Sequence, residues 1–193
     1  MTQRLPVVLS AADLPLAELL AARLDGELFR VDDCFAPVDE IEQPRHRAEA
    51  LRAGLPERLI AEQHSAAWIW GALDTPPRRH ELCVAMGARV SHVGVTRSSV
   101  REVVIEPWEI ETVGGMRVTN PLRTVVDLAR FSATFGDSEE RISRWLALSS
   151  GFGFADCIDD LNRRRNLPNK RQAAERLRAI RDLPSADRLQ AAR

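Results

Sequence analysis

The segment RLIAEQHSAAWIWGAL, residues 58–73, brings Glu62, His64 and Ser65 together, which are residue types found in a nucleophile with its base. Neighbouring side chains on a helix point about 100° apart, so His64 does not face Ser65. The chain contains no GxSxG nucleophile elbow, and Glu62 and His64 lack the i,i+3 or i,i+4 spacing of a helical metal site. We therefore predict a packed structural helix, in which His64 bonds to a backbone carbonyl or to a carboxylate near the helix start.

Other combinations of reactive residues also fail on spacing. The chain has no GxGxxG and no GxxxxGK[ST] segment, so no nucleotide cradle is indicated. Asp74, Glu81, Glu102 and Glu106 could be assembled into an acidic cluster of the nuclease type. Such a site normally also contains a lysine near its carboxylates, and the single lysine, Lys170, lies far from these acids in the sequence. The sequence therefore predicts a non-enzymatic protein with no catalytic residue, no metal site and no cofactor.

The composition is that of a chain with a buried core. Its 193 residues are 45% hydrophobic and 28% charged, which suits one domain or one domain with appendages. Cys34, Cys83 and Cys157 are far apart and form no CxxC pair, so we expect buried free thiols in a reducing cytoplasm. No apolar run approaches the roughly 20 residues of a membrane span, and the N-terminus does not read as a signal peptide. A cytoplasmic location is predicted.

The charge is unevenly distributed along the chain. The net charge is −1, yet residues 163–193 hold ten basic and three acidic residues, which gives +7 there and −8 in the remainder. Two interpretations stay open. The segment is a solvated amphipathic helix or loose tail, or it is an arm that contacts phosphates. The second interpretation assigns DNA contacts to Arg163, Arg164, Arg165, Lys170 and Arg171.

The order of the predicted elements indicates an α+β fold. We expect a reduced N-terminal winged-helix-like unit, a central small β-sheet packed with helices, and C-terminal helices. Turn and capping residues delimit these elements. The expected elements are a helix from Ser10 to Leu24, two very short strands around Asp32-Asp33, a helix opened by Pro44, the 58–73 helix, strands at ELCVAM, HVGVTRS and REVVIEP, a hairpin at Gly114-Gly115, a helix capped by Asn120, and helices at 137–149, 154–165 and 169–180.

The segment GGMRVTNPLRTVVDLAR contains a second group of charged residues. Asp127 follows Arg123 by four residues, so the two can form an ion pair on one face of a helix that anchors the sheet. Alternatively, Arg117 and Arg123 hold a partner's carboxylate or phosphate at the helix N-terminus, where the helix dipole favours an anion.

Four segments carry a family resemblance over residues 9–131: LDGELFRVDDCFAP, EQHSAAWIWGAL, HELCVAM and VTNPLRTVVDLAR. In this order they resemble the AbiEi-type antitoxin and transcriptional regulator family of type IV toxin–antitoxin systems, as found in actinobacteria. The resemblance implies an N-terminal winged helix that binds DNA and a following α/β domain tied to antitoxin action. It implies no enzymatic activity. The implied partners are operator DNA, in autoregulation, and a nucleotidyltransferase-type toxin that is countered without a stable complex.

The N-terminal unit departs from this pattern because only about 26 residues precede the wing, enough for one good helix. That helix offers Arg23 as its exposed cation, and the wing adds Arg30 beside Asp32 and Asp33. We predict a regulator that binds its own promoter through Arg23, Arg30 and the basic residues above. The alternative is an interaction module of the same fold that has lost DNA binding and contacts a partner or dimerises. The predicted domains are a degenerate winged-helix-like unit at 1–40, an α/β core at 41–135, a helical segment at 136–183 and a flexible tail at 184–193.

Overall fold

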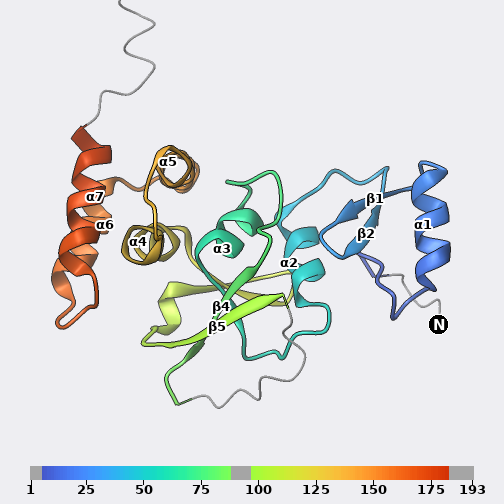
Figure 1. Ribbon diagram of the computed structural model, residues 1–193, viewed down its shortest axis with the longest axis horizontal. Coiled ribbons are helices and arrows are strands. Elements are labelled where there is room, and N and C mark those ends of the chain that lie inside the picture. Colours follow the sequence, from blue (N-terminus) through green and yellow to red (C-terminus); the bar gives the residue numbers. More distant parts are fainter. Residues whose placement is uncertain (1–5, 88–96, 183–193) are drawn as a thin grey trace, which may run out of the picture. The chain divides into compact units, whose positions relative to one another are not determined.

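The computed structural model describes residues 6–87 and 97–182. Within these residues it contains seven α-helices, a two-stranded sheet and a five-stranded sheet, which confirms the α+β class (Figure 1). The chain divides between Thr119 and Asn120 into two compact units, and each is described by itself. This boundary lies inside the 41–135 segment that the sequence predicts as a core. The predicted tail at 184–193 lies outside the described residues.

The first unit begins with helix α1 (Leu16–Leu24) and a hairpin of β1 (Leu28–Val31) and β2 (Cys34–Pro37). The two strands are antiparallel and pair Leu28 with Pro37 and Val31 with Cys34, which confirms the two short strands predicted around Asp32-Asp33. The predicted helix start after Ser10 is wrong. Residues 11–14 form turns, since a residue before a proline disfavours helical geometry and Pro15 occupies the N-cap of α1.

Helix α3 (Gln63–Trp70) is shorter than the predicted 58–73 helix. The two residues Ile60–Ala61 instead form strand β3, because their backbone pairs with strands on both sides. Gly71, in a left-handed conformation with φ of 91°, ends the helix. Helix α2 (Pro44–Arg52) opens at Pro44 as predicted, and the Gln43 N–H donates to His46 Nδ1 over 2.9 Å.

The central sheet has the strand order β5-β4-β3-β7-β6. Its further strands are β4 (His80–Ala85), β5 (Ser98–Val103), β6 (Ile110–Val113) and β7 (Met116–Thr119). The pairs β3–β7 and β4–β5 are parallel, and the pairs β3–β4 and β6–β7 are antiparallel. The ELCVAM strand is confirmed as β4. The REVVIEP strand is confirmed only at its first three residues, because β5 begins earlier, at Ser98, and ends at Val103. Most of the predicted HVGVTRS strand lies outside the described residues.

Helices α2 and α3 pack on one face of this sheet (Figure 1). Leu51 and Trp68 from the helices join Leu82 and Val118 from the strands in one buried cluster. A short 3₁₀ helix, Pro107–Glu109, precedes β6. The predicted β6–β7 turn needs glycine at Gly114, where φ is 50° and an added Cβ would come within 2.7 Å of a backbone oxygen of α2.

The second unit consists of helices α4 (Pro121–Phe131), α5 (Asp137–Ser150), α6 (Phe154–Arg163) and α7 (Lys170–Asp182). Helix α4 packs against the other three. The predicted cap is confirmed, because the Arg123 N–H donates to Asn120 Oδ1 over 2.8 Å. Helix α6 ends at Arg163, two residues before the predicted end, since Arg164 is extended. No helix of residues 6–87 and 97–182 is long and apolar enough to cross a bilayer.

Candidate functional site

Three side chains that are distant in the sequence meet where the hairpin tip reaches the central sheet. Asp32 lies in the β1–β2 turn, Ser65 in the first turn of α3, and His80 at the start of β4. Ser65 Oγ lies 3.1 Å from His80 Nδ1, and His80 Nε2 lies 3.0 Å from Asp32 Oδ2. The structure therefore brings a hydroxyl, an imidazole and a carboxylate into one row. This row was not predicted from the sequence, because His64, and not His80, was tested as the base for Ser65.

Burial limits what this row can do chemically. Ser65 has 0% exposed surface and His80 has 4%. Ser65 Oγ also accepts the Glu81 N–H over 2.9 Å, so its own proton is directed to His80 Nδ1. We assign the imidazole proton to Nε2, which donates to Asp32. A nucleophilic serine must reach its substrate. Ser65 instead joins helix α3 to strand β4, and His80 joins strand β4 to the hairpin.

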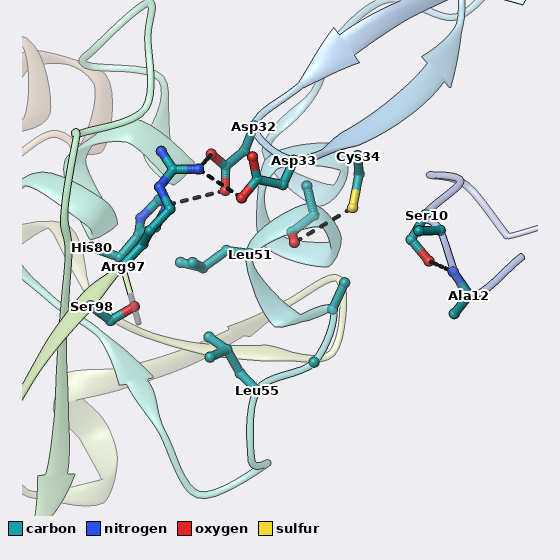
Figure 2. A pocket seen from close by; sticks show the side chains of 14 residues that line it. Ser10, Ala12, Asp32, Asp33, Cys34, Leu51, Leu55, His80, Arg97 and Ser98 are labelled. Carbon is teal, nitrogen blue, oxygen red and sulfur yellow. Dashed lines mark hydrogen bonds and ion pairs between the residues drawn. The ribbon is translucent and has the colours of Figure 1, made fainter. Parts of the chain in front are cut away.

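The hairpin tip carries further charge pairs. Arg97 NH1 lies 2.7 Å from Asp33 Oδ2 and 3.9 Å from Asp32 Oδ1, and Figure 2 shows Arg97 reaching toward both carboxylates. Arg30 donates to Asp33 Oδ1 over 3.0 Å. Burial alone would raise the pKa of Asp32, but the hydrogen bond from His80 and the positive charge of Arg97 hold that pKa below its usual value. Asp32 is therefore a carboxylate at neutral pH.

A cavity of about 390 Å³ lies beside these residues (Figure 2). Asp32, His80 and Arg97 line its polar side, and Leu51 and Leu55 line its apolar side. The thiol of Cys34, which also lines the cavity, stays protonated at neutral pH. Burial first, and then the negative charges of Asp32, Asp33 and Asp13, raise the pKa of its thiol to about 11. Among the described residues, no group of three His, Cys, Asp or Glu side chains is placed to hold a metal ion.

The side chains around His64 form structural pairs. His64 Nδ1 lies 2.9 Å from Glu81 Oε2, and the His64 N–H donates to the same oxygen, which confirms the predicted carboxylate partner near the helix start. Glu62, buried at 1% exposure, receives two hydrogen bonds from Arg101, one of them over 2.6 Å. These contacts hold the start of α3 to strands β4 and β5.

The predicted ion pair in α4 is confirmed. Arg123 Nε lies 2.8 Å from Asp127 Oδ2, and Arg130 NH1 lies 2.9 Å from Asp127 Oδ1. All three side chains are buried. Arg117, the other cation suggested as a partner contact, is half-buried on β7 in the first unit. Within the second unit, Arg123 is thus committed to Asp127.

The structure separates the cations suggested for DNA binding by their surroundings. Arg23 is exposed on α1, whereas Arg30 bonds to Asp33 and to the Asp32 carbonyl. In the second unit Arg163 and Arg165 are exposed. The other three cations suggested in this unit have partners: Arg164 pairs with Asp160, Arg171 pairs with Glu175, and Lys170 Nζ donates to the carbonyls of Asn162 and Arg164.

Comparison with known proteins identifies the central segment. The family model of the AbiEi antitoxin C-terminal domain matches residues 59–145, from β3 into α5. No curated protein matches the chain. The crystal structure of the RV2827C protein from Mycobacterium tuberculosis is similar with a TM-score of 0.38 at 17% identity, over 93% of this chain and 78% of that one, which is too low to support an argument about fold. Residues 59–145 therefore match the AbiEi antitoxin C-terminal domain, of the family that the sequence resembles.

Proposed function

We propose that this protein is a non-enzymatic, antitoxin-like transcriptional regulator that binds DNA and regulates its own promoter in the cytoplasm. The observation that carries the proposal is the antitoxin domain at residues 59–145. Family resemblance suggests the opposing partner, a nucleotidyltransferase-type toxin that acts without a stable complex with the antitoxin.

The chemistry of the buried row supports a protein without a reaction centre. Ser65 has no exposed surface, and its hydroxyl is occupied by the Glu81 N–H and by His80. Burial keeps the thiols of Cys34 and Cys157 protonated, with pKa values raised to about 11 and about 12. A reactive hydroxyl needs access to its substrate, which Ser65 lacks, and a reactive thiol needs to be deprotonated, which these thiols are not.

The exposed end of α6 supports DNA binding. Arg163 and Arg165 are exposed, and among the described residues neither has an acidic partner. Lys170, which donates to neutral carbonyls, keeps its positive charge beside them. Three cations in and beside the loop between α6 and α7 can contact adjacent phosphates, so most of the affinity comes from counterion release and falls steeply with salt.

Titration of the full chain against its own upstream DNA at two salt concentrations tests the proposal. We expect Arg163→Glu and Arg165→Glu each to weaken binding at low salt, with a salt slope shallower by about one. Arg141→Glu, an exposed residue of α5 with the same charge change, is the matched control. Failure of the unmodified protein to bind at low salt would reject DNA binding.

A second function, an interaction module that has lost DNA binding, is favoured by the surface of α1. Leu16, Leu20 and Leu24 recur every four residues, and they are 54%, 42% and 84% exposed. Exposed apolar stripes of this kind mark contact surfaces. Under this alternative Leu20→Glu changes the solution mass or abolishes partner capture in a pull-down, and charge reversal at residues 163–165 leaves function intact.

A further inference from the structure

The carboxylate of Asp33 lies between two guanidinium groups at the hairpin tip. Arg30 NH2 contacts its Oδ1 over 3.0 Å, and Arg97 NH1 contacts its Oδ2 over 2.7 Å. All three side chains are about half exposed, at 58% for Asp33, 56% for Arg30 and 52% for Arg97. The group is therefore open to a large ligand in solution.

Each of the two guanidinium groups also contacts Asp32, in addition to Asp33. Arg30 Nε donates to the Asp32 carbonyl over 2.6 Å, and Arg97 lies 3.9 Å from the Asp32 carboxylate. Asp32 is in turn fixed by His80, and its left-handed backbone, with φ of 53°, shapes the turn. Both cations would thus stay near their positions if the charge of Asp33 were removed.

Two convergent guanidinium groups around one oxyanion form an arrangement that suits phosphate. We propose that Arg30 and Arg97 form a binding site for a phosphate of the nucleic-acid backbone, and that Asp33 occupies this site as an internal substitute. In this state Asp33 competes with DNA and keeps the hairpin from contributing to binding. The inference rests on the proposed function for the identity of the polyanion, and it adds Arg97 to the residues that contact it.

The variant Asp33→Asn keeps the shape of the side chain and removes its charge. The probes are the upstream duplex and an unrelated duplex of equal length, each titrated with the full chain at two salt concentrations. We expect Asp33→Asn to bind both duplexes about tenfold more tightly at low salt, with a salt slope steeper by about one. Because phosphate contacts carry no sequence information, the gain should be equal for the two duplexes.

The matched control is Asp25→Asn, which removes the same charge from an exposed residue of the same unit. It should change the affinity little, because Asp25 has no arginine partner among the described residues. The double variant Asp33→Asn/Arg97→Gln should lose the gain. Thermal melting of each variant checks that the fold is kept.

The outcomes separate this inference from the proposed function. Equal affinities for Asp33→Asn and Asp25→Asn would overturn the inference, while binding by the unmodified protein would still support DNA regulation. Binding by Asp33→Asn alone would support the inference and would reject DNA binding by the unmodified protein. If no variant binds either duplex at low salt, both fail.

Discussion

Removal of the Asp127 carboxylate should strongly destabilise the second unit. Asp127 is 0% exposed and receives hydrogen bonds from Arg123 and Arg130, which are 2% and 5% exposed. Asp127→Ala leaves two buried guanidinium groups without their counter-charge. The substitution therefore tests whether Arg123 stabilises the helix through Asp127 or is available to bind a partner's anion.

The size of the destabilisation depends on the contacts that the arginines retain after Asp127 is replaced. Removing one partner of a buried ion pair costs about 3–5 kcal/mol, because the remaining charge stays desolvated. Arg130 retains a hydrogen bond from Nε to the Pro168 carbonyl and lies 4.4 Å from the Phe131 ring centre. We therefore expect the lower end, about 3 kcal/mol, which is a large share of the roughly 5–15 kcal/mol stability of a domain.

Urea denaturation followed by far-UV circular dichroism measures this loss, since the second unit is helical. Asp159→Ala, at an exposed position of α6, is the control and should change the free energy of unfolding by less than about 0.5 kcal/mol. The triple variant Arg123→Met/Asp127→Leu/Arg130→Met should recover most of the stability, because it leaves no buried charge. A loss below about 1 kcal/mol for Asp127→Ala would refute the reasoning.

Three further predictions concern the first unit and the thiols. Ser65→Ala should lower the free energy of unfolding by about 1–3 kcal/mol, measured in urea, since it leaves buried polar groups unpaired. The folded pKa of Asp32 lies below its usual 3.8, so its stabilisation is present above that value and is lost as the pH falls through the folded pKa. Acid titration of Asp32→Asn should show a weaker loss than the unmodified protein. Cys34 and Cys157 should react with a thiol reagent at pH 8 only on unfolding, because burial raises their pKa values to about 11 and about 12.

Local chemistry explains which elements could be predicted from the sequence. Pro44 opens α2, Gly114 and Gly115 turn the β6–β7 hairpin, and Asn120 caps α4, each through backbone geometry set within a few residues. The predicted start of α3 is wrong because it depends on residues that are distant in the sequence. Ile60 fits a helical pattern, yet it belongs to a strand whose partners lie far along the chain.

The buried row of Ser65, His80 and Asp32 could not be predicted from neighbouring residues either. Ser65 and His80 are 15 residues apart, and His80 and Asp32 are 48 apart. Only the pairing of β4 with β3 and the docking of the hairpin bring them together. One signal was available, because His80 begins a run of apolar strand residues, and a histidine there needs buried partners.

The basic segment at residues 163–171 shows why formal charge overstates a binding surface. Five cations were suggested there, but Arg164 is compensated by Asp160 and Arg171 by Glu175. Lys170 donates hydrogen bonds to carbonyls, which are neutral, so its positive charge is not compensated. Three uncompensated cations therefore remain: Arg163, Arg165 and Lys170. If each neutralises one phosphate, the slope of log affinity against log salt from this segment is about −3. A steeper slope would require a second surface, and Arg23, exposed on α1, is one candidate for it. The Arg30–Arg97 pair would add to the slope only once Asp33 is neutralised.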